Sequence, residues 1–372
     1  MRWDKSCLWF ILFAAFIFGG STLWCPVDAS DGEDGLKVDG DFRYRYERID
    51  QEDKDVYDRH RLRARVGLAA MVNDQTHFFL RLASGSTDPI STNQTLDDAS
   101  SSKGIWLDRA YLDIRPVQTP GLNLMAGKIS NPFYTPQKSQ LIWDGDLNPE
   151  GLAAKFSHGK GALKLFASGS GWIIDNRKAE SDVFMYGLQG GINREFDEQD
   201  LNLTAGASFF SYTELKDKPL LMSDSFGNST PDDAADIYAN EYTLIEGFFK
   251  AAFSVARRPV ALFADFVTNT DPSEENVGWM AGVEVGKAMR PGTAKVSYNY
   301  RELQRDAVLG IFSDSDFAGG GTNAKGHQIS VVLKLMTNLD AGAIFFANTR
   351  GIADGEDGLD YQRLQVDLMS KF

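Results

Sequence analysis

Apolar and polar side chains alternate residue by residue through most of this chain, and this two-residue period constrains the fold more than any other feature. In residues 361–372, one parity holds Leu364, Val366, Leu368 and Phe372, and the other holds Arg363, Gln365, Asp367 and Lys371. Because successive side chains of a strand point to opposite faces, this segment is predicted to be a strand with one apolar and one polar face. An exposed strand edge invites aggregation, so we expect the last strand to pair with the first and close a barrel.

The same period recurs from residue 36 onward, and helical spacing does not fit these segments. Counting them predicts about sixteen strands, joined alternately by short turns and by long polar loops. Long loops are expected at residues 85–103, 130–149, 216–239 and 306–325. This layout is typical of outer-membrane proteins, whose short turns lie on the periplasmic side. We therefore predict an all-β fold, a transmembrane antiparallel β-barrel with apolar faces toward lipid and polar faces toward a water-filled lumen.

The first 29 residues differ in composition from the rest of the chain. Arg2 and Lys5 precede an apolar run at residues 8–18, and the segment ends on the small residue Ala29. This order of charged, apolar and small residues is typical of a secretory signal. The domain prediction is therefore a signal peptide at residues 1–29, followed by a single transmembrane β-barrel domain at residues 30–372.

Cysteine content and net charge restrict the sites and partners of the mature protein. Cys7 and Cys25 both lie in the predicted signal, so the mature chain would have no disulfide and no thiolate metal site. A lipoprotein signal that uses Cys25 is the weaker alternative, because Trp24 is too bulky for the position before such a cysteine. The formal net charge of −14 argues against a nucleic-acid partner, which needs a basic surface.

Three segments carry a resemblance to a known family: WLDRAYLDIRP at residues 106–116, GKISNPF at 127–133 and LIWDGDLNPEGL at 141–152. They resemble the Gram-negative putative porin family, the broad group near the phosphate-selective porins, and the resemblance runs over nearly all of the mature chain. It implies a channel of the cell outer membrane through which small hydrophilic solutes diffuse passively.

Several partners follow from that location. We expect contacts with the lipid bilayer and with lipopolysaccharide, and the resemblance implies that the barrel-insertion machinery reads the terminal Phe372. Such terminal signals usually have an apolar residue two before the end, where this chain has Ser370. General porins are often trimers, so a homotrimer is one option that the resemblance allows.

Arginines dominate the inward parity of the early strands, with almost no lysine among them: Arg43, Arg45, Arg61, Arg63, Arg65, Arg81, Arg109 and Arg115. Arginine keeps its charge at any working pH, so neighbouring arginines repel unless water, counter-ions or carboxylates separate them. General porins that resemble this layout fold the loop at residues 130–149 inward, and that region carries Asp144, Asp146 and Glu150. Trp143 in the same loop is expected to anchor on the barrel wall.

We therefore predict a constriction in which an arginine wall faces an acidic loop. Its expected residues are Arg43, Arg45, Arg61, Arg63, Arg65, Arg81, Arg109, Asp144, Asp146 and Glu150. Charged side chains at close range set ion selectivity, and a preference for anions is the hypothesis. The alternative is that single arginines only pair with carboxylates of the wall, such as Asp41 or Glu47.

Parity also predicts the orientation of one acidic residue. Asp108 falls on the outward parity near the loop end of its strand, where a charge costs less than at mid-depth of the membrane.

Aromatic rings favour the boundary between lipid and water, and the following are expected there on the side of the long loops: Tyr46, Trp106, Tyr242, Phe266, Trp279, Tyr298 and Tyr300. Phe372 is expected at the opposite rim.

Patterns of catalysis and metal binding are weak. The histidines His60, His77, His158 and His327 are scattered without metal-ligand spacing, and no Gly-x-Ser-x-Gly motif occurs. We predict no enzyme activity, no catalytic residue, no cofactor and no metal site. DGEDGL at residues 31–36 and 354–359 could hold Ca²⁺ through oxygen ligands, but it lacks the spacing of a calcium loop.

Two other functions remain open at this point. A dedicated outer-membrane saccharide transporter or exporter would need a stacked aromatic track along the lumen, for which the candidates are Phe79, Tyr111, Phe166 and Phe248. A structural or adhesive barrel would instead bind partners through its long loops and would show no conductance.

Overall fold

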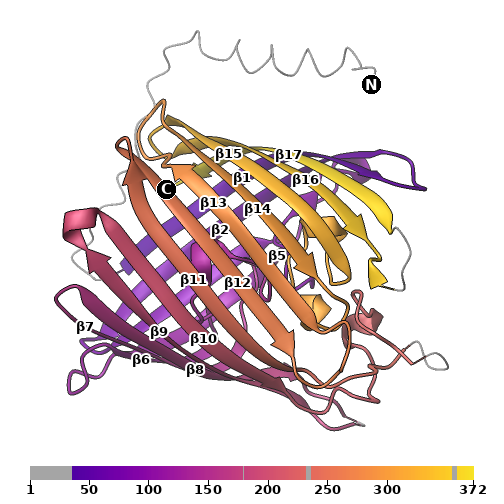
Figure 1. Cartoon of the computed structure of the whole chain (residues 1–372), viewed down its shortest axis with the longest axis horizontal. Helices are drawn as coiled ribbons and strands as arrows, with labels where there is room; N and C mark the ends of the chain where they lie inside the picture. Colours follow the sequence, from indigo (N-terminus) through magenta and orange to yellow (C-terminus); the bar gives the residue numbers. More distant parts are fainter. Residues whose placement is uncertain (1–35, 179, 232–235, 354–357) are drawn as a thin grey trace.

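The computed structural model describes residues 36–178, 180–231, 236–353 and 358–372. These residues form one closed barrel of inclined antiparallel strands (Figure 1). Seventeen strands belong to the sheet, but β4 (Gln94–Thr95) has two residues and pairs only with β2 (Tyr57–Asn73), so sixteen strands make the wall. The predicted all-β barrel of about sixteen strands is confirmed.

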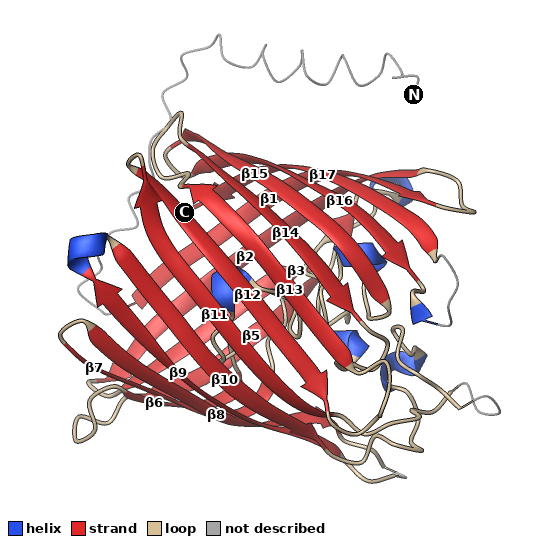
Figure 2. Cartoon of the chain, in the orientation of Figure 1, coloured by secondary structure: helices blue, strands red, loops and turns tan. Residues whose placement is uncertain are grey.

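The barrel closes where the sequence pattern predicts. The first strand, β1 (Leu36–Gln51), pairs with β2 on one side and with the last strand, β17 (Leu359–Lys371), on the other. The other wall strands follow in chain order: β3 (Thr76–Ser84), β5 (Ile105–Ile114), β6 (Leu122–Lys128), β7 (Glu150–Lys160), β8 (Leu163–Asp175), β9 (Val183–Phe196), β10 (Leu201–Tyr212), β11 (Thr243–Val255), β12 (Arg258–Asn269), β13 (Val277–Gly286), β14 (Ala294–Leu303), β15 (Ala324–Met336) and β16 (Leu339–Arg350). Helical structure in the described ranges is limited to short turns (Figure 2), and none of it is long and apolar enough to cross a membrane.

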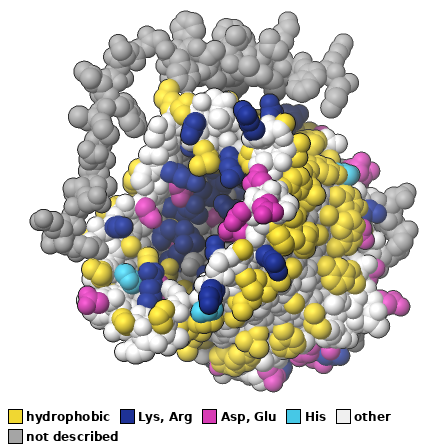
Figure 3. All heavy atoms as spheres, turned by 60° about the vertical axis from the view of Figure 1, so that its left-hand side comes forward, with side chains coloured by type: hydrophobic (Ala, Val, Ile, Leu, Met, Phe, Trp, Pro, Cys, Tyr) yellow, Lys and Arg dark blue, Asp and Glu magenta, His cyan; other side chains and the backbone are white. Residues whose placement is uncertain are grey.

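The apolar parity of the strands faces outward, as predicted. Leu152 and Leu188 are each 65% exposed, and Val366 on the last strand is 46% exposed. Their inward neighbours on the same strands are buried, because the pleat sends alternate side chains into the barrel. The barrel therefore presents an apolar outer belt to lipid, part of which is visible as the hydrophobic flank in Figure 3.

The prediction that Asp108 faces outward is wrong. The pairing of β3 with β5 shifts by one residue between Arg81 and Leu82, so Leu82 lies opposite Leu107 and Asp108 is skipped. Such a bulge reverses the face of the extra residue. Asp108 is buried inside the barrel, where its carboxylate accepts hydrogen bonds from Arg81 and Asn148.

An apolar core inside the barrel is the main feature that alternation alone does not predict. On the side of β8 to β14, side chains from the inner wall and from four long loops pack together near the strand ends that carry those loops. Its members include Trp143, Trp172, Phe210, Leu244, Val267, Leu309 and Phe312. Tyr242 also belongs to this core and is fully buried, with its hydroxyl donating to Asp306 at 2.7 Å. The prediction that Tyr242 lies at the lipid boundary is therefore wrong.

Two expectations fall on residues outside the described ranges. The predicted signal peptide at residues 1–29 lies wholly there. Most of the DGEDGL stretches at residues 31–36 and 354–359 lies there as well.

Candidate functional site: an arginine wall beside an inward loop

The structure brings the predicted arginines together on one side of the lumen. Arg43 of β1 lies opposite Arg63 of β2, and Arg45 lies opposite Arg61 in the same ladder. Arg81 of β3 lies opposite Arg109 of β5. Figure 3, which looks toward the barrel end with the short turns, shows basic side chains lining a hollow. Because all of them share the inward parity on adjacent strands, they form one continuous patch, called here the arginine wall: Arg43, Arg45, Arg61, Arg63, Arg65, Arg81 and Arg109.

A cavity of about 550 Å³ separates the arginine wall from residues of two loops. One is the β6–β7 loop, residues 129–149, and the other is the β14–β15 loop, residues 304–323. All members of the arginine wall except Arg61 line this cavity, together with Lys138, Asp144, Asp146 and Asp316.

The β6–β7 loop is fixed to the wall opposite the arginines. Gln189 of β9 accepts the backbone N–H of Tyr134 at 2.7 Å and donates to the carbonyl of Tyr134 at 2.9 Å. The Ser139 hydroxyl donates to Asp265 of β12 at 2.6 Å. Trp143, predicted to anchor on the wall, packs edge-on against Trp172 at 5.0 Å between ring centroids. These contacts place the loop inside the barrel.

Glycines of the wall make room for this attachment. Phe166 of β8 lies over Gly191, and Phe248 of β11 lies over Gly206, where an added Cβ would come within 2.2 and 2.3 Å of the respective rings. The ring of Tyr134 sits against both phenylalanines, at 5.5 and 5.2 Å. The two glycines therefore let two inward rings lie flat and form a seat for the loop.

Asp146 is the loop carboxylate that meets the arginine wall. It lies 3.1 Å from Arg65 and 3.8 Å from Arg63, and it also accepts from the hydroxyl of Thr92 at 2.8 Å. Burial alone would raise the pKa of Asp146, but Arg63, Arg65 and the Thr92 hydroxyl together hold it below its usual range. Asp146 is therefore ionised and neutralises part of the wall.

Asp144 has a different environment, although it is only two residues away. Its carboxylate accepts the backbone N–H of Ser315 at 2.9 Å, and its own N–H donates to the carbonyl of Phe312 at 2.7 Å. Asp144 thus joins the β6–β7 loop to the β14–β15 loop. Burial is the main cause that raises the pKa of Asp144 well above its usual value, and repulsion from the carboxylates of Asp314 and Asp146 adds to it.

Glu150 does not join the constriction. It begins β7 with the same parity as the outward Leu152, and it pairs with Lys128 at 2.8 Å. Its side chain is 62% exposed. Arg115, which also had inward parity, lies near the turn after β5, where it pairs with Asp113 at 2.6 Å.

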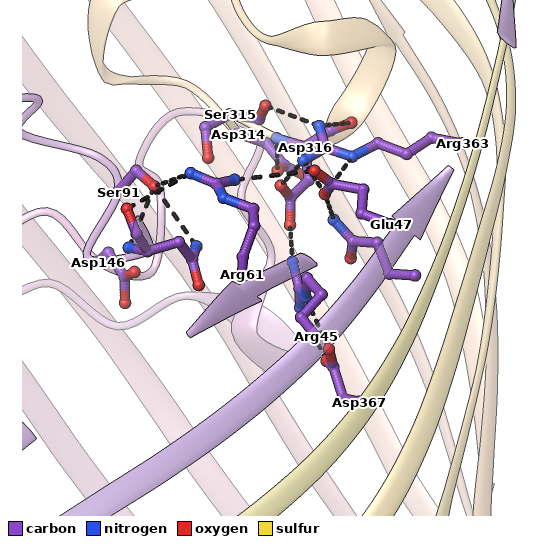
Figure 4. Close-up of polar contacts among 12 residues, drawn as sticks. Arg45, Glu47, Arg61, Ser91, Asp146, Asp314, Ser315, Asp316, Arg363 and Asp367 are labelled. Atoms are coloured by element: carbon purple, nitrogen blue, oxygen red, sulfur yellow. Dashed lines mark hydrogen bonds and ion pairs between the residues drawn. The ribbon is translucent and has the colours of Figure 1, made fainter. Parts of the chain in front are cut away.

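The β14–β15 loop contributes a carboxylate that sequence reasoning missed. Asp316 lies 3.2 Å from Arg45 and 2.7 Å from Arg363 of β17 (Figure 4). Burial opposes ionisation, but Arg363 and Arg45 lower the pKa of Asp316 strongly. In the sequence, Asp314 and Asp316 are two acidic residues of a polar loop, and nothing in that pattern locates them inside the barrel.

A buried ion cluster joins the first and last strands beneath that loop. Glu47 of β1 accepts from Arg363 of β17, and Arg45 donates to Asp367 of β17 at 2.7 Å (Figure 4). Glu47 also accepts from Arg59 of β2. The wall carboxylates named in the alternative prediction therefore do pair with arginines. Asp41 does so as well, at 2.8 Å from Arg63 and 2.7 Å from Arg65.

The four inward rings proposed for an aromatic track form two separate pairs. Phe79 and Tyr111 stack at 4.9 Å on β3 and β5, on the side of the arginine wall. Phe166 and Phe248 lie on β8 and β11, where Tyr134 sits against them. Among the described residues, no group of three or more His, Cys, Asp or Glu side chains could hold a metal ion.

Comparisons with known proteins agree with this architecture. The model of a family described as putative porin matches residues 27–244 and 233–372. OprB of Pseudomonas putida is 10% identical, with 91% of this chain and 94% of that chain covered at a TM-score of 0.63. OmpF of Salmonella typhi, solved with daunomycin, is 13% identical over 91% and 98% of the two chains, with a TM-score of 0.55. The outer membrane channel DcaP of Acinetobacter baumannii is 14% identical over 91% and 97%, with a TM-score of 0.51. A comparison with curated proteins finds no match.

Proposed function

We propose an anion-preferring, passive diffusion channel for this chain, which belongs to the putative porin family. Family and fold together make it a channel of the outer membrane and not an enzyme. The proposal adds how the channel selects: small hydrophilic solutes pass between the arginine wall and the β6–β7 loop, and negatively charged solutes pass more readily.

The charge balance of the cavity carries this proposal. In the described part of the chain, six arginines and Lys138 line it, against three carboxylates, Asp144, Asp146 and Asp316. Arginine cannot lose its charge under physiological conditions. A narrow passage with an excess of fixed positive charge attracts anions and repels cations.

The aromatic side chains give less support to a saccharide transporter. A track that guides a chain of sugar rings would need stacked aromatic side chains in succession along one path. Here the pair of Phe79 and Tyr111 and the pair of Phe166 and Phe248 lie on different walls, and Tyr134 sits against the second pair. An adhesive barrel would predict no conductance after clean reconstitution.

Reversal potential in a planar bilayer under a salt gradient tests the proposal. We expect the wild-type channel to be anion-preferring and the variant Arg61→Ser/Arg63→Ser/Arg65→Ser to lose most of that preference, because Asp41 and Asp146 would then dominate this part of the wall. Arg115→Ser is the matched control, since Arg115 lies away from the cavity beside Asp113. A cation preference in the wild-type protein that persists in the triple variant would overturn the proposal.

Further properties of the mature protein belong to the same proposal. They are cleavage of residues 1–29 as a signal peptide, reading of Phe372 by the barrel-insertion machinery, contacts with lipopolysaccharide, and assembly as a homotrimer. Phe372 is 66% exposed, as a residue available to another protein must be. Amino-terminal sequencing of the mature chain and its mass in mild detergent would test the first and last of these.

A further inference from the structure

The arginines that line the cavity fall into two groups by partner. Four contact a carboxylate: Arg45 contacts Asp316 and Asp367, Arg63 and Arg65 contact Asp41 and Asp146, and Arg81 contacts Asp108. A guanidinium beside a carboxylate forms a pair of zero net charge, and the carboxylate occupies the N–H groups that an arriving anion would use. These four therefore contribute less to anion binding than their number suggests.

Arg43 and Arg109 form the second group. Arg43 donates from Nη2 to the side-chain oxygen of Asn93 at 2.5 Å, and Arg109 donates from Nε to the side-chain oxygen of Asn148 at 2.5 Å. Among the ion pairs of the described residues, none involves Arg43 or Arg109, whose side-chain hydrogen bonds go to amide oxygens. An amide oxygen accepts a hydrogen bond without adding charge, so each arginine keeps its full positive charge and its remaining N–H donors.

Both asparagines are held in place by other groups. Asn93, in the connection between β3 and β5, donates from its side chain to the Ser91 hydroxyl at 3.4 Å. Asn148, at the end of the β6–β7 loop, donates to Asp108 at 2.8 Å and to the carbonyl of Asp146 at 2.8 Å. Each amide therefore turns its oxygen toward an arginine, because its nitrogen is engaged elsewhere.

Arg43 also carries one of the three buried, unsatisfied donors of the arginine wall, and the other two are Nε of Arg61 and Nη2 of Arg81. Nε of Arg43 is buried and has no hydrogen-bond partner, although a buried N–H group normally has one. Nη1 and Nη2 of Arg109 are not used in its bond to Asn148. Paired N–H groups of a guanidinium match the two oxygens of a planar oxyanion.

We propose that Arg43 and Arg109 are the two arginines that bind the passing anion, and that Asn93 and Asn148 are positioning residues that hold them without neutralising them. This inference rests on the proposed function and deepens it. The solute class is a small oxyanion such as a carboxylate, which takes two parallel hydrogen bonds from one guanidinium. The other four lining arginines shape the wall and hold the loops.

The variant Asn93→Asp tests the inference most directly. Aspartate has the shape of asparagine, and the Ser91 hydroxyl can donate to the new oxygen, so the local geometry is retained while Arg43 gains a carboxylate. We expect the anion-to-cation permeability ratio, measured from reversal potential with sodium acetate, to fall several-fold. Asn93→Ser keeps the site neutral and should retain the ratio of the wild-type channel.

Asn131→Asp is the matched control. Asn131 lines the same cavity, but its side-chain oxygen accepts the backbone N–H of Phe133 at 3.1 Å and does not touch an arginine. It adds the same charge to the same space, and we expect a clearly smaller effect. Equal effects of Asn93→Asp and Asn131→Asp would overturn the inference, because any added charge would then act alike.

Asp146→Asn gives a second test that does not depend on folding of the Asn93 variant. It removes a carboxylate from Arg65, so the permeability ratio should rise, and an unchanged ratio would contradict the inference. A wild-type channel without anion preference would refute the proposed function itself. An anion-preferring wild-type channel in which the Asn93 and Asp146 variants behave normally would refute only the assignment of Arg43 and Arg109.

Discussion

Asp144 and Asp146 show how far two carboxylates in one loop can differ. Arginines surround Asp146, whereas Asp144 faces backbone N–H groups and the carboxylate of Asp314. The sequence placed both in the constriction because both lie in a loop of the kind that porins fold inward. It could not tell them apart, since their partners come from β2 and from the β14–β15 loop, far away along the chain.

The raised pKa of Asp144 predicts that contact between the two loops weakens as pH rises. Below pH 3.8, the usual pKa of the carboxyl group, Asp144 is protonated whether the loops are joined or apart. Its protonation state therefore does not change the free energy of the contact between the loops. As pH rises above that value, the separated state releases a proton that the joined state retains, so separation becomes progressively easier until the joined state also ionises. Current fluctuations of a single channel should therefore increase as pH rises above 3.8.

Asp144→Asn is the variant that isolates this effect. An amide does not titrate, so the variant should lose most of the pH dependence of the fluctuations, whatever their absolute level. A pH dependence equal to that of the wild-type channel would show that another group controls the contact.

The two-residue period predicts correctly that some charged side chains face the lumen, and it fails for others. All seven arginines of the wall lie inside the barrel, because they share a parity on adjacent strands. Glu150 does not, because the loop ends just before it and β7 turns it outward with Leu152. The inward turn of Asp108 depends on a one-residue bulge, which a regular two-residue period cannot anticipate.

The β6–β7 loop acts as an element in its own right, because many contacts of moderate strength hold it to β8–β12. Gln189→Ala would remove both hydrogen bonds to the backbone of Tyr134 and the one to Ser208. Leaving those buried groups unsatisfied should cost about 1–3 kcal/mol. Because 1.4 kcal/mol is tenfold in an equilibrium constant, the detached state should become roughly tenfold more populated.

Single-channel recording checks this prediction through the frequency of transitions to a larger conductance. Gln328→Ala is the control, because Gln328 bonds only Asn299 among the contacts described and does not touch the loop. Identical traces for both variants would mean that the aromatic seat around Tyr134 suffices to hold the loop.

Strands could be predicted from the sequence, but the inner core could not. The two-residue period is a local property, and it sets which side chains face outward on every strand. The core depends on loops that meet across the lumen, such as Asn228 with the backbone of Val308 at 2.8 Å. Apolar residues on both parities, as at Phe209–Phe210 and Phe248–Phe249, are the one local signal that part of the lumen is dry.

The molecule as a whole depends on the seam between β1 and β17. Arg363 is 3% exposed, contacts Glu47 and Asp316, and donates to the carbonyl oxygens of Ser315 and Asp316 at 3.2 Å each. Removing one partner of a buried ion cluster leaves the others uncompensated and costs about 3–5 kcal/mol. Arg363→Met should therefore lower the unfolding temperature of the barrel in detergent, followed by circular dichroism.

Lys164→Met serves as the comparison for that measurement. Lys164 and Glu195 form an ion pair with 55% and 43% exposed side chains, and exposed pairs contribute about 0–1 kcal/mol. A similar shift for both variants would mean that the cluster around Arg363 does not hold the seam. Parity predicted that Arg363 and Asp367 face inward, but their partners on β1 follow only from closure of the barrel.

The apolar core fills the interior beside β8 to β14 at the end with the long loops, and the cavity of the arginine wall lies to one side, beside β1, β2, β3 and β5. A cube of about 550 Å³ has an edge of about 8 Å, similar to the Debye length at physiological salt, about 8 Å. A migrating ion there has no room to keep a full ionic atmosphere between itself and the guanidinium groups. Discrimination by charge should consequently persist in saline media that would abolish it in a wide, centred pore.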